Sequence, residues 1–433
     1  MWNGKKIKFA LSKALSIRIK ISLLLAFFIV PVVMGFAQTT DTTSVLHPQA
    51  YFVDKNVRKA VIPFTSVNNL IIIPLQLNNV VPLKFLLDTG VKTPLLIERL
   101  YSDILHIEYE RKLSLRGGGQ EAPVEAYLAP NVAFKLPQVQ LDQQAMLVLQ
   151  EDYLQLSKQL GTEVHGIIGA TIFKQFVVEI DYEALEITLH NPVYFRKPLG
   201  YQEFGLSVEG AKPYIEVEVT GADNQKDTLR VLLDTGASHA LLLHNERACV
   251  AKPDSTIRGK LGRGLLGDIS GDIGRIPYMA MGKYNFSDVL VSFPDEESYA
   301  ISSAKIERDG TIGGEFLRRF STYIDYPNNK LYLQRSSNYR DDFVFTKTGI
   351  ELEADGDDLR TFIITSVREN SSGERAGIQT GDKLIKVGGR KTKNMELSQI
   401  LERFRGRDGR KLKIKLLRNE QEINCTLILQ DML

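Results

Sequence analysis

Val81-Pro-Leu-Lys-Phe-Leu-Leu-Asp88-Thr89-Gly90 is an apolar run that ends in Asp-Thr-Gly, and Thr228-Leu-Arg-Val-Leu-Leu-Asp234-Thr235-Gly236 repeats the pattern. A single carboxylate at the end of a strand is usually a turn or cap residue. Two apolar runs that end in the same tripeptide predict two buried strands, each of which places one aspartate at a tight turn.

A second block also occurs twice. It reads Gly166-Ile-Ile168-Gly169 in the first half and Gly310-Thr-Ile312-Gly313 in the second, and an Ile-Asp-Tyr sequence follows each copy. Blocks in the same order at nearly the same separation indicate one structural unit used twice, and two copies are too few for a solenoid. We therefore expect two halves related by a pseudo-twofold axis that brings Asp88 and Asp234 together.

The rest of both halves consists of short apolar or alternating runs separated by turn residues, which predicts a mainly β fold. Short helices are expected over 170–175 and 315–319. Asp181 and Asp325, which also repeat, are expected to form turns.

The N-terminus has the features of a secretory signal peptide. Residues 1–20 contain six basic and no acidic residues, an apolar run follows over 21–34, and small residues stand at Gly35 and Ala37. We expect cleavage of residues 1–37, a linker over 38–59, and a periplasmic or secreted bacterial protein. A membrane contact is expected only if the segment is not cleaved.

Composition and motifs exclude several classes of function. Removal of the signal segment takes the formal net charge from +2 to −4, and no basic cluster predicts a nucleic-acid partner. Gly262-Arg-Gly264-Leu-Leu-Gly267 matches a dinucleotide fingerprint, but the turn-rich sequence after it predicts no helix, so no cofactor is expected. The absence of His-Glu-x-x-His and Gly-x-Ser-x-Gly sequences argues against a metal site and a serine hydrolase.

Two carboxylates that meet at short range have a definite chemistry. Because like charges this close cannot both ionise, Asp88 and Asp234 would share one proton. One carboxylate would then act as a base on a bound water, and its protonated partner would act as an acid toward a carbonyl oxygen.

The four blocks resemble those of the aspartic proteases of the pepsin and retropepsin clan, over about residues 60–335. The resemblance implies a bilobal β-barrel body, with lobe 1 at 60–198 and lobe 2 at 199–338. It implies an aspartic endopeptidase acting on a peptide or protein substrate, with Asp88 and Asp234 as the catalytic pair. The alternative is an inactive peptide-binding protein on the same scaffold, which the bulky Val91 after the first tripeptide favours.

The same resemblance implies supporting roles around the pair. Two threonines would bond across the pseudo-dyad, two glycines would let the loops turn, two Ile-Gly pairs would pack behind the loops, and a glycine-rich hairpin would form a flap over the substrate. These residues are Thr89 and Thr235, Gly90 and Gly236, Ile168-Gly169 and Ile312-Gly313, and Gly117, Gly118 and Gly119.

Residues 343–433 have a different sequence pattern. The sequence Ala376-Gly-Ile-Gln-Thr-Gly-Asp-Lys-Leu-Ile385 resembles bacterial PDZ domains, which implies a small α+β domain over 343–433 that binds the C-terminus of a peptide along a sheet edge. A helix is expected over 395–404. The residues expected to bind the peptide are Gly349, Ile350, Leu352, Leu397 and Ile400, although core packing is an equal alternative for the last two.

Overall fold

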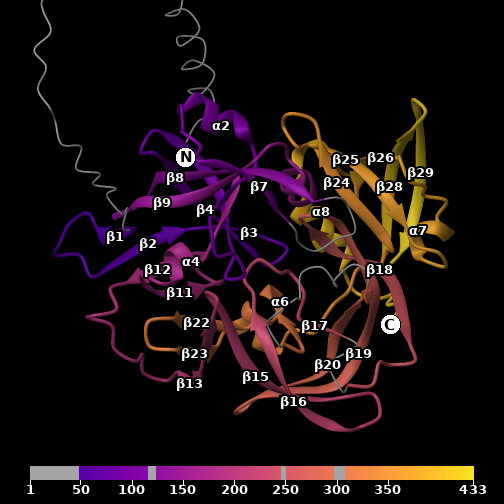
Figure 1. The fold of residues 1–433 in the computed structure, drawn as a ribbon. Coiled ribbons are helices and arrows are strands. Elements are labelled where there is room, and N and C mark those ends of the chain that lie inside the picture. Colours follow the sequence, from indigo (N-terminus) through magenta and orange to yellow (C-terminus); the bar gives the residue numbers. More distant parts are fainter. Residues whose placement is uncertain (1–47, 116–122, 245–249, 297–307) are drawn as a thin grey trace, which may run out of the picture. The chain divides into compact units, whose positions relative to one another are not determined.

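The structure is a computed structural model that describes residues 48–115, 123–244, 250–296 and 308–433 (Figure 1). The expected signal peptide and the expected flap tip at Gly117, Gly118 and Gly119 lie outside these ranges. Strands make up most of the described elements, so the prediction of a mainly β fold is confirmed. None of the described helices has the length and apolar character needed to cross a membrane.

The first half is built on a nine-stranded sheet. Strand β5 pairs with β4 in antiparallel fashion and with β10 in parallel fashion. A strand flanked on both sides and covered on both faces has to be apolar, which explains the Phe-Leu-Leu sequence before Asp88. The strands, in spatial order, are β1 (Gln49–Phe52), β9 (Val139–Leu149), β6 (Leu95–Leu96), β10 (Gly166–Ile168), β5 (Val81–Leu87), β4 (Leu70–Leu77), β8 (Val124–Leu136) and β7 (Arg111–Leu115), with β3 (Thr65–Val67) beside β4.

The second half repeats this arrangement in an eight-stranded sheet. Strand β16 lies between an antiparallel neighbour, β15, and a parallel neighbour, β21, as β5 lies between β4 and β10. The strands, in spatial order, are β14 (Ser207–Glu209), β15 (Lys212–Thr220), β16 (Lys226–Leu233), β21 (Gly310–Ile312), β17 (Leu241–Leu243), β20 (Tyr284–Pro294), β19 (Gly267–Met281) and β18 (Thr256–Gly264).

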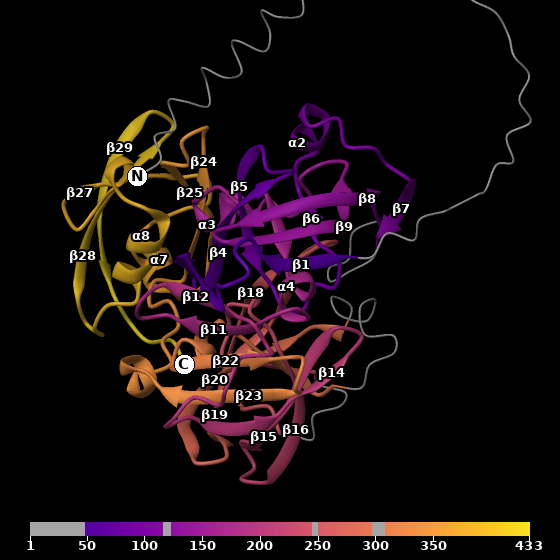
Figure 2. The ribbon, with the colours of Figure 1, turned by 90° about the vertical axis from the view of Figure 1, so that its left-hand side faces the viewer.

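A six-stranded sheet contains strands from both halves. Its central pair is antiparallel, with Val178 of the first half opposite Ile324 of the second (Figure 2). The turns that follow this pair are closed by Asp181, which accepts hydrogen bonds from two backbone N–H groups, and by Asp325, which accepts one, so their predicted turn role is confirmed. The strands are β13 (Gln202–Gly205), β23 (Lys330–Arg335), β22 (Phe320–Asp325), β11 (Val177–Asp181), β12 (Glu186–His190) and β2 (Lys59–Pro63).

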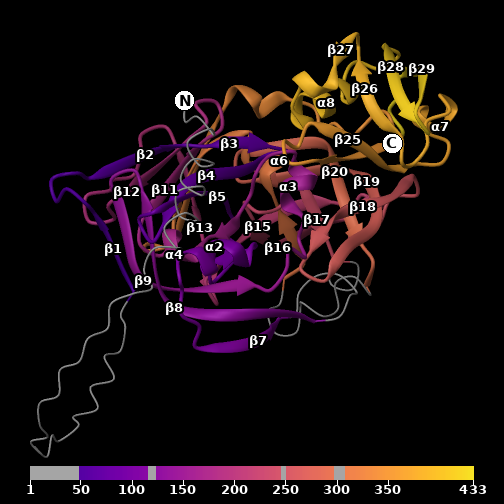
Figure 3. The ribbon, with the colours of Figure 1, turned by 90° about the horizontal axis from the view of Figure 1, so that it is seen from above.

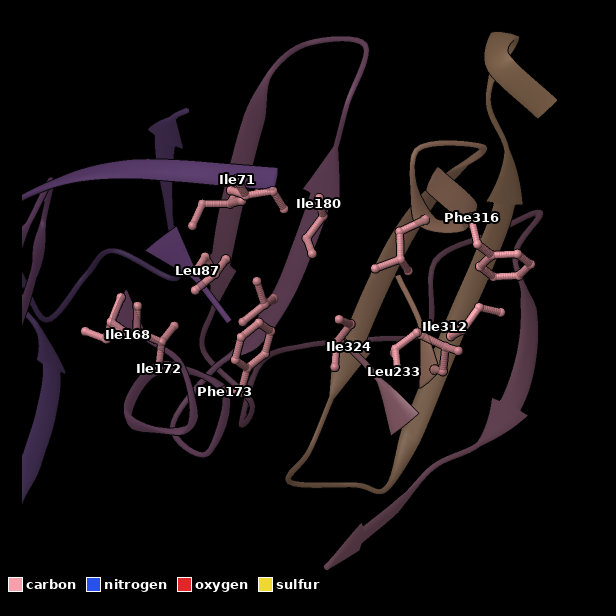
Figure 4. Packing of buried hydrophobic residues seen from close by; sticks show 14 of the residues in the cluster. Ile71, Leu87, Ile168, Ile172, Phe173, Ile180, Leu233, Ile312, Phe316 and Ile324 are labelled. Carbon is pink, nitrogen blue, oxygen red and sulfur yellow. The ribbon is translucent and has the colours of Figure 1, made fainter. Parts of the chain in front are cut away.

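One hydrophobic core runs through both halves. Figure 4 shows its repeated packing: Leu87, Ile168 and Ile172 in the first half have Leu233, Ile312 and Phe316 as their counterparts in the second. All six side chains are fully buried. The repeat seen in the sequence is therefore a repeat of buried contacts, which fixes the backbone next to Asp88 and Asp234.

The C-terminal part has its own sheet and its own core. Helix α8 covers this core with Leu397, Ile400 and Phe404, at the three- and four-residue spacing that predicted it, and a capping box of Glu396 and Gln399 starts it. The strands are β24 (Ile350–Asp355), β25 (Thr361–Val367), β26 (Lys383–Val387), β28 (Lys411–Arg418), β29 (Gln421–Ile428) and β27 (Arg390–Lys391).

The described helices are short. Helix α4 in the first half and helix α6 in the second are the two that the sequence predicted after Gly169 and Gly313. The helices are α2 (Arg99–Ile104), α3 (Leu156–Leu160), α4 (Ala170–Phe173), α6 (Gly314–Leu317), α7 (Ser372–Arg375), α8 (Leu397–Phe404) and the 3-10 turns η1 (Ser337–Arg340) and η2 (Thr392–Asn394).

Candidate functional site

The two aspartates follow strands that end in the same way. The backbone N–H of Asp88 donates to the carbonyl of Ile168 at 2.9 Å, and that of Asp234 donates to the carbonyl of Ile312 at 2.9 Å. The parallel strands β10 and β21 therefore continue their pairing one residue beyond β5 and β16. This extension fixes where each aspartate leaves its sheet.

Two threonines join the loops across the pseudo-dyad. The hydroxyl of Thr89 donates to the carbonyl of Leu233 at 2.6 Å, and that of Thr235 donates to the carbonyl of Leu87 at 2.8 Å. Each hydroxyl also accepts from the other threonine's backbone N–H, at 3.1 Å and 3.0 Å. Both threonines are completely buried, so these four bonds lock the two loops together without competition from water.

The carboxylates lie over the glycine of the opposite loop. A Cβ atom added at Gly236 would lie 2.3 Å from Cγ of Asp88, and one added at Gly90 would lie 3.3 Å from Oδ2 of Asp234. The backbone N–H of each glycine donates to the aspartate of its own loop, at 2.6 Å for Gly90 and 2.9 Å for Gly236. At Gly236 only glycine leaves room for the facing carboxylate, and at Gly90 a Cβ atom would also lie 2.9 Å from Oδ1 of Asp88 in its own loop.

The Ile-Gly pairs pack directly behind the loops. Ile168 and Ile312 are fully buried, and a Cβ atom at Gly169 would lie 1.8 Å from the backbone oxygen of Asp88. At Gly313 it would lie 2.6 Å from the backbone oxygen of Ala237. The structure thus brings together the aspartates, threonines, glycines and isoleucines that the sequence predicted to meet.

Burial controls the electrostatics of the pair. Burial, followed by the charge of Asp234 and a hydrogen bond with its carboxyl group, raises the pKa of Asp88 well above its usual value. The N–H of Gly90 and the ammonium of Lys212 act in the opposite direction. When two carboxyl groups are hydrogen-bonded to each other, the state with one shared proton is favoured.

Two neutral polar groups surround the pair. Burial lowers the pKa of His239 to about 4, and burial raises the pKa of Tyr326, with the charges of Asp88 and Asp234 adding to the effect. Within the described residues, Nε2 of His239 and the hydroxyl of Tyr326 are buried without a hydrogen-bond partner. The burial of His239 fits a structural role.

Sequence reasoning missed Lys212 and Tyr326. Lys212 begins β15 and acts electrostatically on both aspartates, while Tyr326 follows Asp325 in the turn after β22. The β15–β16 pairing ends at Tyr214 and Leu232, two residues short of both Lys212 and Asp234, so counting back from the hairpin turn would have drawn attention to Lys212.

The expected peptide-binding residues lie in the C-terminal domain. Gly349 has a φ of +67° and leads into β24, which forms an edge of its sheet. Ile350 and Leu352 are buried in β24, and the side chains of Leu397 and Ile400 belong to the domain core, with exposed fractions of 1% and 0%.

Comparison with known proteins assigns the C-terminal region. The PDZ domain family matches residues 363–418, so the chain contains a PDZ domain, as predicted. A probable CtpA-like serine protease of Staphylococcus saprophyticus is 29% identical over 133 residues, which are 31% of this chain and 26% of that protein. The solved structure of a photosystem II D1 C-terminal processing protease matches 20% of this chain and 23% of its own length, at 20% identity and a TM-score of 0.19.

These findings correct the functional interpretation. The identification as an aspartic endopeptidase of the pepsin and retropepsin clan is contradicted, because the curated relative is a serine protease. The predicted hydrolysis by a water activated between Asp88 and Asp234 is therefore wrong as well. The same holds for the alternative, an inactive protein on that scaffold, and for the exclusion of a serine hydrolase. The physical reason is that Asp-Thr-Gly repeats specify a loop geometry, and a loop geometry does not specify a reaction.

Proposed function

We propose that this chain takes part in peptide processing and that its PDZ domain binds the C-terminal end of the peptide. The match of residues 363–418 to the PDZ family carries the proposal, and the name of the curated relative, a CtpA-like serine protease, supports it. The chain covers 26% of that relative, so the relative's activity is carried over to this chain only as part of the proposal.

The edge position of β24 supports peptide binding. A peptide that pairs with an edge strand gains backbone hydrogen bonds, and its terminal carboxylate is held by the N–H groups of the preceding loop. Here that loop is 346–349, and the strand offers Ile350 and Leu352. Leu397 and Ile400 of α8 would form the floor of the pocket for the last side chain.

The chain itself covers part of this face. Lys158 of α3 forms an ion pair with Asp355 of β24 at 3.4 Å, and a Cβ atom at Gly161 would lie 2.5 Å from Cβ of Leu397. Helix α3 therefore lies against β24 (Figure 2), and Gly161 after it contacts Leu397 at the start of α8, which Figure 3 shows from above. In the proposal, an incoming peptide displaces α3 from this position.

Binding of labelled peptides to the full chain, measured by fluorescence anisotropy, tests the proposal. A peptide with a free C-terminus should bind, and the same peptide with a C-terminal amide should not. Gly349→Ala should lose binding, because its Cβ would lie 2.2 Å from Cβ of Ser371. Gly356→Ala is the matched control, since its φ is also positive but its nearest neighbour is 3.6 Å away. Equal affinity for acid and amide would overturn the proposal.

We further propose that the Asp88–Asp234 pair is a functional site that holds one exchangeable proton. Acids with little access to water are costly, and this pair lies on two loops that four threonine bonds lock together, with His239 and Tyr326 near enough to feel its charge. The two halves, 60–198 and 199–338, are in this proposal the two lobes of one β-barrel body, followed by the PDZ domain at 343–433.

Peptide cleavage by the full chain tests the processing role. Cleavage products of a mixed peptide library can be identified by mass spectrometry for the wild type, with and without a serine-directed covalent reagent. Inhibition by the reagent would support the chemistry of the relative. Absence of cleavage by the wild type would contradict a processing role.

We also propose that the protein is exported, as the N-terminal segment predicts. N-terminal sequencing of the protein purified from an expressing bacterium tests this. A mature chain that begins near residue 38 supports export, and retention of the first 37 residues in a membrane fraction contradicts cleavage.

A further inference from the structure

The sheet of the PDZ domain has one apolar face and one basic face. Every second residue of β28 is buried in the core that α8 covers, so the residues between them lie on the other face of the sheet. These outward residues are Lys411, Lys413 and Lys415. Residues 383–418 contain thirteen basic and three acidic residues, although the chain without its signal segment is acidic overall. Basic charge is therefore concentrated in this domain.

Cross-strand pairing extends the row of lysines over the neighbouring strands. Lys386 of β26 stands directly opposite Lys415 of β28 and, on its other side, directly opposite Lys391 of β27 (Figure 1). Lys383 pairs with Leu417, which follows Lys415 by two residues and so lies on the same face. Six lysines from three strands therefore share one face of the sheet.

This arrangement does not stabilise the sheet. Like charges directly opposite each other on neighbouring strands repel, and Lys386 has a lysine on both sides. Among the described residues, the six lysines form a single ion pair, between Lys415 and Glu422 of β29. The other five ammonium groups have no acidic partner within the described chain, so the face is suited to an anion from outside it.

We propose that this basic face, formed by Lys383, Lys386, Lys391, Lys411, Lys413 and Lys415, docks the PDZ domain on an anionic lipid surface. A lysine is a point charge on a flexible stem, which suits the diffuse negative charge of a headgroup layer, whereas the fork of an arginine suits single phosphates. The face also presents Ile428, which is 51% exposed directly opposite Lys411. An apolar side chain beside cations adds buried apolar area at a membrane interface.

The face does not have the features that favour a nucleic acid. On β29 the outward residues, which pair with Leu417 and the lysines of β28, are Glu422, Asn424, Thr426 and Ile428. No aromatic ring is therefore available on these described strands for stacking on bases.

Docking on lipid leaves the proposed peptide-binding edge accessible. Strand β24 lies at the far end of the sheet and is separated from β28 by β25 and β26. The basic face also lies on the side of the sheet opposite α8. A lipid surface and a peptide can therefore contact the domain at the same time.

Cosedimentation of the chain from residue 38 with lipid vesicles tests the inference. This chain keeps every residue that the structure describes and omits the basic and apolar N-terminal segment, which would bind vesicles by itself. It should sediment at low salt with vesicles of phosphatidylglycerol and phosphatidylcholine in equal parts, and not with phosphatidylcholine alone. Added salt should release it, because exposed charges are screened.

A triple variant, Lys386→Gln with Lys411→Gln and Lys413→Gln, removes half of the basic face. Each lysine near an anionic surface contributes about fivefold to binding, so the partition onto anionic vesicles should fall about a hundredfold. Arginine at the same three positions keeps the charge and should keep the binding.

The matched control replaces Lys135, Lys174 and Lys226 by glutamine. These three lysines are exposed and lie in the first and second halves of the chain, so the net charge changes equally while the basic face stays intact. The control should bind anionic vesicles as the wild type does. An equal loss in both triple variants would assign the binding to net charge and overturn the docking face. A wild-type chain that binds a mixed-sequence DNA duplex at the same salt, but not the anionic vesicles, would also overturn lipid docking.

Discussion

The loop after β5 and the loop after β16 are copies of each other in their backbone hydrogen bonds. Each aspartate N–H donates to an isoleucine carbonyl of the parallel neighbour strand, and each threonine bonds to the other loop. The packing behind the two loops differs, since a Cβ atom at Gly169 would lie 1.8 Å from the backbone oxygen of Asp88 and one at Gly313 would lie 2.6 Å from that of Ala237. The comparison separates the hydrogen bonds that hold the pair together, which are symmetric, from the packing behind each loop, which is not.

The largest expected effect concerns the two glycines behind the loops. In Gly169→Ala the new Cβ would lie 1.8 Å from the backbone oxygen of Asp88, whereas in Gly313→Ala it would lie 2.6 Å from those of Ala237 and His239. Because backbone atoms of a locked loop cannot move aside cheaply, we expect Gly169→Ala to cost about 3 kcal/mol or more and Gly313→Ala about 1–3 kcal/mol. Urea unfolding of the two variants measures the difference, and equal costs would show that the loops relax alike.

The threonine bonds test the symmetric part of the comparison. Thr89→Val and Thr235→Val each remove a buried hydroxyl that donates to a carbonyl and accepts from an N–H group of the opposite loop. Each substitution leaves a backbone carbonyl and an N–H group without partners, so we expect a loss of about 2–4 kcal/mol for either. The double variant should lose less than the sum, because the four bonds form one network. Fully additive losses in chemical denaturation would contradict that network.

The pH dependence of stability tests the shared proton. The pKa of Asp88 is raised in the folded protein by burial and by Asp234. A raised pKa stabilises the folded state at pH values below the ordinary aspartate range, and that contribution is lost as the pH rises through the folded pKa. Stability should therefore fall with a slope of up to about 1.4 kcal/mol per pH unit for one proton.

Asp88→Asn removes this proton and should flatten the slope of stability against pH. The stability of the variant relative to the wild type should therefore increase as the pH rises. Thermal unfolding over a series of buffers measures the effect. Glu163→Gln is a suitable control, because that exposed carboxylate pairs only with Lys84 at the surface. Parallel stability curves for Asp88→Asn and the wild type would mean that the pair holds no extra proton.

Part of the fold and of the candidate site could be predicted from the sequence. The apolar runs and the Ile-Gly blocks predicted both loops and the meeting of Asp88 with Asp234, because each block is local and its pattern is strong. The electrostatic effect of Lys212 on the pair was not predicted, since it depends on where β15 begins relative to the loop after β16. The reaction class was predicted wrongly, because residues that build a loop do not reveal what binds above it.

Both halves also contact the PDZ domain, through different residues. The first half does so through Lys158 of α3, which pairs with Asp355 at 3.4 Å, and the second through Lys260 of β18, which lies 3.7 Å from Glu353. Both acidic partners belong to β24. The contact of the first half extends to Leu397, through Gly161, so we expect it to be the one that competes with a peptide.

The smallest expected effect follows from that contact. Lys158→Glu replaces an attraction with a repulsion and should favour the state in which α3 has left β24, which raises the apparent affinity for a peptide. The ion pair is half exposed on both sides, and such pairs are worth about 0.2–1 kcal/mol, so the gain should be at most about fivefold. Lys112→Glu breaks a pair of similar exposure, with Glu125, away from the PDZ domain. Anisotropy titrations that show the same gain in both variants would assign the effect to net charge and would exclude α3 as the competitor.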